Sequence, residues 1–551
     1  MKLKFLAQSI VVVFTLFALA SCTELDLHYE GGTADDDQLG EATQAIPKRA
    51  DAAVNGMYAL LGKPYVYFGE ASGRADDMGY MSVCLGQDLN SGDMTNIVSG
   101  YDWFSVALEY SDRTPTYANP QIRNGLFYKI IYSTRDVLTM IPDGTDNAEL
   151  MAKRGQAKAM RAFSYLSLAP YFQFKYKGNE DKPSVPLADE TVDPRNNPRV
   201  TLQKLYEVII QDLTDAIADL DGFVRPNKGT IDQKVAYGLR ARAYLNMEMW
   251  AEAAADAEKA LVGFTPYGIN DLKAPGFYNA TDPNWIWAIL LPADVVGQEL
   301  ATWPSQIGSF SGNAYVPYAG IWRSINKLLY DKIPSTDVRK KWWLDSDTAS
   351  SYLDSLTWTD YAKNITYKGQ EIPGAVITDV KVKMEPYANV KFGQRSGVGE
   401  AVNDGDWCLM RAEEMILLRA EALAKAGDLP AGKTVLEDFV KTYRSPAYTS
   451  TASTLADFEN EVWLQRRIEL WGEGFAMADV MRLGKNVVRY HPGKATNVPE
   501  DYQFNISAND PWLLLRFVQR ETTNNVAIVQ NTGGTQPSSG NGADLLDGVT
   551  D

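Results

Sequence analysis

The chain has 551 residues, enough for one large domain or several ordinary ones with a sizeable hydrophobic core. Its 70 acidic residues outnumber 53 Lys and Arg, and the formal net charge of −17 argues against nucleic-acid binding and against direct docking on anionic lipid. The two histidines and three cysteines are too few and too scattered for a His/Cys metal site or a His-based catalytic triad. We therefore expect no metal ion and no cofactor.

The first 21 residues have the pattern of a bacterial export signal. Two lysines precede an apolar segment at residues 10–20, which is too short to cross a membrane comfortably. Residues 19–22 (LASC) resemble a lipobox, in which Cys22 is acylated before the signal peptide is removed. An acylated Cys22 would anchor the chain to a membrane, whereas a secretory signal with a chance cysteine would not.

The segment after the signal predicts a tether followed by helices. Residues 22–45 are polar and acidic, which favours a flexible tether, and residues 46–225 predict an N-terminal helical region. Thr201 is a candidate cap for one of its helices. The apolar residues that recur at helical spacing are Ile122, Leu126, Ile130, Val137 and Ile141 in one helix, and Leu202, Leu205, Ile209, Leu213, Ile217 and Leu220 in another.

Residues 226–262 predict a helix–turn–helix hairpin that resembles part of a tetratricopeptide repeat. Residues 408–443, inside a C-terminal helical region at 401–532, repeat the arrangement. Because stacked pairs bury a shared core, we expect a mainly α fold with tetratricopeptide-like hairpins forming one large scaffold. Residues 427–434 match the phosphate-loop formula, but that loop needs a strand before it and here a helix is expected, which argues against nucleotide binding.

Residues 263–400 differ from the helical regions. They are rich in Gly, Pro, Trp and Tyr with weak periodicity, so we expect an irregular, loop-rich ligand-binding region with short strands. Residues 533–551 are rich in Gly, Ser and Asn and predict a mobile tail. Cys84 and Cys408 lie far apart in the sequence, and a disulfide or two buried free thiols are both compatible with this spacing.

Aromatic residues are the positive indication of a binding site. Tyr and Trp rings match the C–H face of a pyranose, and Asn, Asp, Gln and Arg match its hydroxyl rim. For any single Trp the alternative is packing in the core. Two clusters in polar, turn-rich segments are the candidate ligand-binding residues: Tyr101, Asp102 and Trp103 in the first, and Trp303, Gln306, Asn313, Tyr315, Tyr318 and Trp322 in the second.

Five ordered segments of the chain resemble the SusD/RagB family. The most specific is residues 466–474 (RRIELWGEG), which continues to Asp479 and Arg482. The chain departs from the family pattern at Ala476, where the family usually has Arg, and at Val518, where it usually has Pro. The resemblance covers nearly the whole mature chain, and its other segments are residues 161–165 with 183–187, 205–216, 411–422 and 519–531.

The resemblance implies a non-catalytic receptor, lipid-anchored at the outer-membrane surface, that delivers bound glycan to a TonB-dependent SusC-like transporter. A peptide receptor of the RagB type is the alternative within the family, and the Trp content of the loops favours glycan. Two alternatives lie in other classes. A lipoprotein glycoside hydrolase is one, because a chain with 70 acidic residues offers many carboxylate pairs. A structural assembly scaffold built on the helical hairpins is the other.

Overall fold

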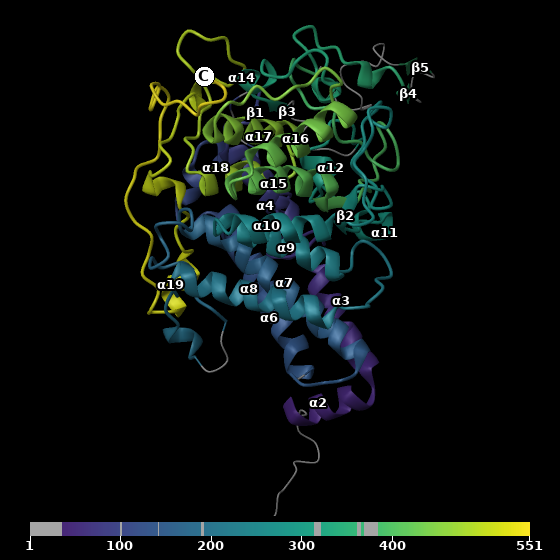
Figure 1. The fold of residues 1–551 in the computed structure, drawn as a ribbon, viewed down its shortest axis with the longest axis vertical. Helices are drawn as coiled ribbons and strands as arrows, with labels where there is room; N and C mark the ends of the chain where they lie inside the picture. The colour runs from purple at the N-terminus through teal and green to yellow at the C-terminus, as the bar shows by residue number, and fades with distance from the viewer. Residues whose placement is uncertain are drawn as a thin grey trace, which may run out of the picture.

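A computed structural model describes residues 36–97, 99, 102–141, 143–188, 192–312, 321–360, 365–368 and 384–551. This part of the chain is mainly helical, which confirms the predicted fold class (Figure 1). No helix in it is long and apolar enough to span a membrane. The helices are α2 (Asp36–Ala45), α3 (Asp51–Ala59), α4 (Tyr80–Asn90), α5 (Ser105–Leu108), α6 (Ala118–Met140), α7 (Ala148–Phe172), α8 (Leu202–Asp219), α9 (Gln233–Asn246), α10 (Trp250–Ala260), α11 (Ala293–Val296), α12 (Trp303–Gln306), α14 (Lys327–Tyr330), α15 (Ala412–Lys425), α16 (Leu429–Tyr443), α17 (Leu455–Glu469), α18 (Ala476–Leu483) and α19 (Gln519–Asn524).

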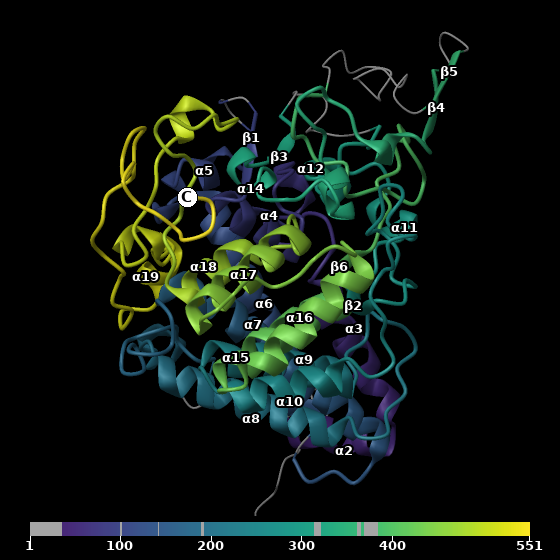
Figure 2. The same ribbon diagram turned by 45° about the horizontal axis from the view of Figure 1, so that its top comes forward.

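Helices α6 to α10 form a stack in which each packs against the next along the chain, and α15 and α16 continue it (Figure 2). Helix α8 shows why successive helices pack together: Leu205, Ile209 and Leu213 lie on one face of it and are completely buried. Thr201 caps the helix, because its side chain accepts a hydrogen bond from the Lys204 N–H at 3.2 Å. Burial of this apolar face between α7 and α9 stabilises the helix more than its intrinsic propensity does.

The pair α15–α16 has the predicted hairpin form. Gly432 allows the two helices to approach closely, since a Cβ there would lie 2.6 Å from the Ala420 main-chain oxygen. The turn contains Gly427, with φ of +104°, and Asp428, whose side chain accepts from the Ala431 N–H at 3.0 Å. The segment that matches the phosphate-loop formula is therefore a helix–helix turn with an amide already capped by a carboxylate, and it is not built to hold a phosphate.

Short antiparallel strand pairs organise the loop-rich region. The register of β1 (Met94–Asn96) with β3 (Arg323–Ile325) sets Asn96 opposite Arg323. The pair formed by β2 (Trp285–Ile289) and β6 (Trp407–Arg411) leads directly into α15. Both of these pairs are buried along their whole length. In the described residues the pairs are β1 (Met94–Asn96) with β3 (Arg323–Ile325), β2 (Trp285–Ile289) with β6 (Trp407–Arg411), and β4 (Thr357–Asp360) with β5 (Ile365–Lys368).

A buried ionic network ties the loop-rich region to the C-terminal helices. Arg411 Nη1 lies 2.7 Å from Glu469, and Arg411 Nε lies 2.8 Å from Glu473. From the loop-rich region, Lys391 reaches Glu473 at 2.6 Å and Arg339 reaches Glu469 at 3.1 Å. Loss of one partner from such a network typically costs several kcal/mol, because it leaves an uncompensated buried charge. The family motif at residues 466–474 is thus a fold-maintaining element.

The C-terminal residues 533–551, predicted to be mobile, pack on the body of the protein. Asp547 is buried and accepts a hydrogen bond from Arg467 Nη1 at 2.8 Å. Gly542 has φ of +63°, and a Cβ there would lie 2.4 Å from the Asn505 main-chain oxygen. Gly534 and Gly542 serve close packing here, so the chain is held on the body at these points and at Asp547, in contrast to the expected mobile tail.

The N-terminal region departs from the expected flexible tether at residues 22–45. Helix α2 falls inside the predicted tether and packs against α6, so its residues 36–45 are helical. Residues 22–35 lie outside the described part of the chain.

Cys84 and Cys408 are both free and buried, so they form no disulfide. Burial raises the pKa of both thiols well above the ordinary value, which keeps them protonated and unreactive.

Candidate ligand-binding surface

Arg323 on β3 brings together the two sequence clusters that were predicted to bind ligand. Its Nη1 donates a hydrogen bond to Asp102 Oδ2 at 2.9 Å, and its Nε donates to the Gln306 main-chain oxygen at 3.0 Å. Figure 2 shows β1, β3 and α12 side by side at this point. Because both partners of the ion pair are buried, the pair fixes the position of two loops that are distant in sequence.

Asp102 organises the turn that carries Trp103. One carboxylate oxygen accepts from the Phe104 N–H, and the other accepts from Asn96 Nδ2 at 2.7 Å as well as from Arg323. Asp102 is only 1% exposed. These contacts make Asp102 a residue that positions the turn, in place of the direct ligand contact that the sequence suggested.

Trp103 begins a row of aromatic rings and cations, which we name the aromatic–cation row: Trp103, Arg74, Phe68, Tyr67 and Lys129. The Arg74 guanidinium lies 5.0 Å from the centre of the Trp103 ring and 5.5 Å from that of Phe68. Phe68 meets Tyr67 edge to face at 4.8 Å, and the Lys129 ammonium lies 5.1 Å from the Tyr67 ring. Phe68 is 37% exposed, and Trp103 is partly buried. The row thus presents ring faces and cationic donors together at the surface.

Two acidic residues hold the row in place. Asp77 accepts the main-chain N–H groups of Tyr67 at 3.0 Å and Phe68 at 2.7 Å, and Arg74 Nη2 lies 2.7 Å from Asp76. Burial raises the pKa of Asp76 against the opposing effect of Arg74. Burial also raises the pKa of Asp77 against the effect of the two N–H donors. Both carboxylates therefore have structural partners. Lys129 has them as well, because its Nζ donates to the main-chain oxygens of Val66 at 2.9 Å and Tyr67 at 3.1 Å. The rings and the remaining N–H groups of the two cations are what the surface offers to a ligand.

The sequence predicts only one member of this row, Trp103. Residues 65–68 (YVYF) and Arg74 are not among the predicted binding residues. A signal was present, since three aromatic residues fall within four positions between Pro64 and Gly69, both of which favour turns. The sequence did not show that this segment lies close to Trp103 in the fold.

The second sequence cluster lies deeper than predicted. Trp303 and Trp322 are completely buried, and so is Gln306, whose Nε2 donates to the Leu300 main-chain oxygen at 3.1 Å. Trp303 Nε1 donates to the Gly405 oxygen at 2.6 Å. The expectation that these side chains lie exposed at the surface is therefore wrong, because all three are buried in the interior. They are buried because the Trp303 ring packs on other rings, with Phe392 at 5.8 Å and Trp407 at 5.5 Å between centroids.

Five residues named from the sequence lie outside the described part of the chain: Tyr101, Asn313, Tyr315, Tyr318 and the lipidation candidate Cys22. Their roles stay predictions. Among the described residues, no group of three or more His, Cys, Asp and Glu side chains is placed to hold a metal ion.

Solved structures share this fold. A SusD-like carbohydrate-binding protein from Bacteroides vulgatus is 23% identical, with 87% of this chain and 96% of that chain covered and a TM-score of 0.68. A SusD superfamily protein from Bacteroides thetaiotaomicron is 21% identical, with 88% and 99% covered and a TM-score of 0.65. A laminarin-binding SusD-like protein is 18% identical, with 88% and 99% covered and a TM-score of 0.58. At these identities the likeness establishes the fold.

Family models match two long segments of the chain, although no curated protein matches it. The model described as "SusD family" matches residues 327–533, which include the motif at 466–474 and the buried ionic network. The model described as "Starch-binding associating with outer membrane" matches residues 81–245, which include Trp103 and much of the helical stack. The fold, the motif and both matches agree that the chain belongs to the SusD/RagB family.

Proposed function

We propose that the protein binds glycan on the aromatic–cation row, without cleaving it, and delivers it to a SusC-like TonB-dependent transporter in the outer membrane. The observation that carries this proposal is the partly exposed row from Trp103 to Lys129, next to the loops that Arg323 fixes. The family description "starch-binding" and the laminarin-binding structural neighbour support a glycan as the ligand.

The chemistry of the row suits a sugar chain. The faces of Trp103 and Phe68 match pyranose C–H groups, while Arg74 and Lys129 donate hydrogen bonds to hydroxyl oxygens. Each stacked ring contributes about 1 kcal/mol beyond the area it buries. A few such contacts give affinities between millimolar and micromolar. Binding in this range suits a receptor that has to release its ligand to a transporter.

The proposal includes a lipid anchor at Cys22 and a location on the outer-membrane surface. The lipobox-like residues 19–22 and the family description "associating with outer membrane" support it. Fractionation of cells that express Cys22→Ala tests the anchor: the variant is expected in the soluble fraction and the wild type in the membrane fraction. Continued sedimentation of the variant with membranes would contradict lipid anchoring.

Pull-down on a panel of insoluble polysaccharides tests the binding surface. We expect Trp103→Ala and Phe68→Ala each to weaken binding about fivefold to tenfold, in line with about 1 kcal/mol per ring. Tyr237→Ala is the matched control. Tyr237 also lies under cations, with Lys259 at 4.8 Å and Arg240 at 5.7 Å from its ring, but it belongs to the α9–α10 hairpin.

The same assay separates the rival functions. Retention of oligopeptides with no retention of any polysaccharide would favour a RagB-type peptide receptor. Release of reducing sugar from a retained polysaccharide would favour a hydrolase, and binding of the transporter without any ligand would favour a scaffold. If wild type binds glycan and neither row variant weakens it, the ligand lies elsewhere on the protein.

A further inference from the structure

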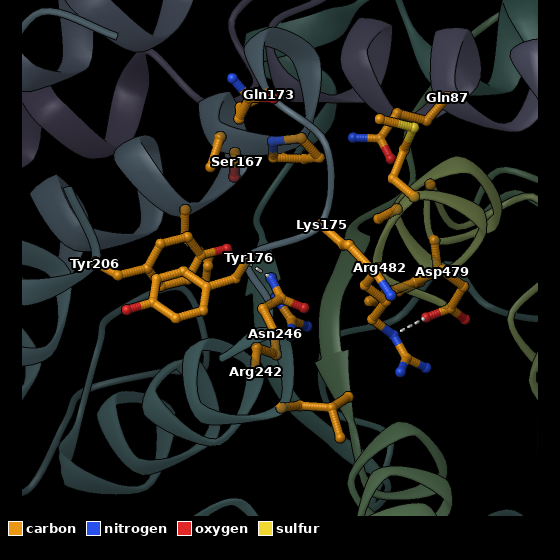
Figure 3. A pocket seen from close by; sticks show the side chains of 18 of the residues that line it. Gln87, Ser167, Gln173, Lys175, Tyr176, Tyr206, Arg242, Asn246, Asp479 and Arg482 are labelled. Carbon is orange, nitrogen blue, oxygen red and sulfur yellow. Dashed lines mark hydrogen bonds and ion pairs between the residues drawn. The ribbon is translucent and has the colours of Figure 1, made fainter. Parts of the chain in front are cut away.

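Two cavities that share no residue with the aromatic–cation row differ in how their polar groups are satisfied. The first lies among α7, α8, α9 and α18 (Figure 3). Its arginines are paired with carboxylates, as Figure 3 shows for Arg482 Nε and Asp479 at 2.8 Å, and Arg242 lies 2.6 Å from Glu414. The second, which we name the α17 groove, contains polar groups without such partners.

The α17 groove is lined by segments that are far apart in the sequence. Its volume is about 570 Å³, within the range of about 300–1,000 Å³ that is usual for small-molecule sites. Figure 1 shows α14, α17 and the C-terminus at the same end of the molecule. Helix α17 presents one face to the groove, and loops after α14 and α16 and the end of the chain complete it. The lining residues fall within residues 332–337, 445–451, 460–465 and 548–549.

Gln465 places an unpartnered amide group in this groove. Its Oε1 accepts a hydrogen bond from Arg339 Nη2, and because a guanidinium only donates, the amide oxygen has to face Arg339. The amide nitrogen is therefore turned the other way. This Nε2 has no hydrogen-bond partner among the described residues, and it keeps contact with solvent although Gln465 as a whole is 6% exposed. A ligand oxygen that accepts from Nε2 supplies the missing partner.

Glu461, one helical turn before Gln465 on the same face of α17, supplies acceptors. Its carboxylate accepts from the Tyr448 hydroxyl at 2.7 Å and from the Ser450 hydroxyl at 2.5 Å, and it forms no ion pair with the described residues. Each carboxylate oxygen has a further lone pair for a ligand donor.

The charges in the lining of the α17 groove nearly balance. Asp337 lies 2.7 Å from Arg339, which neutralises it. The lining also contains Lys332, which offsets the charge of Glu461. The groove therefore offers hydrogen-bond donors and acceptors side by side with no large excess of either charge, which favours an uncharged polar ligand.

We propose that the α17 groove binds a neutral sugar unit, with Gln465 Nε2 and the Glu461 carboxylate on its hydroxyl groups. A sugar hydroxyl donates and accepts at the same time, so it uses an amide N–H and a carboxylate together. Leu464 and Val549 also line the groove and are partly exposed, so they offer apolar contact to the C–H groups of the ring. The proposal does not depend on glycan binding at the aromatic–cation row. If both places bind, two weak contacts with one long glycan strengthen each other.

Ligand-observed NMR titration with maltose, cellobiose and laminaribiose tests the proposal. The titration uses the mature chain and a double variant, Trp103→Ala with Phe68→Ala, in which the row has lost two of its rings. We expect saturable binding of at least one of the three disaccharides to the double variant.

Further substitutions in the double variant locate the binding. Gln465→Glu keeps an acceptor for Arg339 but removes the Nε2 donor, and it is expected to weaken binding about fivefold. Ala447→Phe is expected to abolish binding by filling the groove, because Ala447 lines it. Ala251→Phe is the matched control, since Ala251 is an exposed alanine on α10 outside the groove.

Several outcomes would overturn the proposal. Failure of all three disaccharides to bind the double variant does so, and binding to the wild type alone would assign the sugar to the row. Binding that Ala447→Phe leaves unchanged, while the variant unfolds at the wild-type temperature, also overturns it. Tighter binding of glucosamine than of glucose would show that Glu461 selects a cation and not a neutral sugar. Binding to the double variant that Ala447→Phe removes supports the groove even if the row binds no glycan.

Discussion

Asp102 and Arg323, 221 residues apart in the sequence, form a buried ion pair with 2.9 Å between Oδ2 and Nη1. This one contact joins the loop that carries Trp103 to β3 and, through the Gln306 main-chain oxygen, to α12. Asn96 bridges the pair, because its Nδ2 donates to Asp102 and its Oδ1 accepts from Arg323. The geometry of the turn that carries Trp103 therefore depends on a buried ion pair.

Asp102→Asn tests this dependence. The substitution keeps the shape of the side chain but leaves the Arg323 charge buried without its counter-ion, which typically costs about 3–5 kcal/mol. Urea unfolding measures the loss, and polysaccharide pull-down below the unfolding transition is expected to weaken too, because the Trp103 turn loses its anchor. Asp136→Asn is the control, since its side chain is 67% exposed and lies 4.0 Å from Arg135. Equal stability of the two variants would contradict the argument.

Trp303→Ala and Trp103→Ala are expected to separate stability from binding. Trp303 is completely buried among Phe392 and Trp407, so its loss leaves a cavity and lowers the free energy of unfolding by about 3–5 kcal/mol. Trp103 is only partly buried, so its loss weakens glycan binding more than it weakens the fold. Chemical unfolding and pull-down on the same preparations check both effects. A Trp303→Ala variant with wild-type stability and reduced binding would indicate that Trp303 contacts the ligand.

The sequence was sufficient to predict the helices but not to predict how deeply the side chains of the loops are buried. Apolar residues at helical spacing and Gly427-Asp428 at a turn are local signals, and α8 and the α15–α16 hairpin follow from them. Whether an indole faces water depends on which distant residues cover it. Trp303 is covered by Phe392 and Trp407, about a hundred residues further along. Arg74, which precedes α4 in the sequence, lies over the ring of Trp103, which follows α4. Amphipathic periodicity carries no information about such contacts.

Gly474→Ala is expected to destabilise the junction between the family motif and α18. Gly474 has φ of +87°, and a Cβ there would lie 2.6 Å from the Cys84 Cα. Gly493→Ala is the matched control: its φ is +81°, but nothing lies within 4 Å of its Cβ position. Both variants bear the left-handed backbone penalty of about 1–2 kcal/mol, and only Gly474→Ala adds a clash with backbone. Thermal unfolding is expected to show the larger loss at position 474, and equal losses would contradict the predicted clash.

Asp88 gives the protein a pH dependence with a defined sign. Its carboxylate is buried under the start of α18, where it accepts the N–H groups of Gly474 at 3.0 Å and Ala476 at 3.2 Å. Burial raises the pKa of Asp88 from 3.8 to about 7, despite these donors, and the neighbouring Asp93 adds to the increase. Between about pH 4 and 7 the unfolded chain releases this proton while the folded chain keeps it. The contribution of Asp88 to stability is therefore complete below pH 4 and is lost as the pH rises to 7.

Asp88→Asn isolates this effect, because the variant has no proton to release at this position. The free energy of unfolding of wild type minus that of Asp88→Asn is expected to fall by about 1 kcal/mol per pH unit between pH 4.5 and 6.5. Asp547→Asn is expected to give a slope of the opposite sign, but only below about pH 4.5, where the unfolded chain begins to bind the proton that the folded chain does not. Burial alone would raise the pKa of Asp547, but Arg467 and the backbone N–H groups of Thr550 and Val549 outweigh it and hold that pKa below its ordinary value. Denaturant titrations from about pH 3 to pH 6.5 check both signs. A flat difference curve for Asp88→Asn between pH 4.5 and 6.5 would mean that the carboxylate is already ionised in the folded protein, held by its two N–H donors.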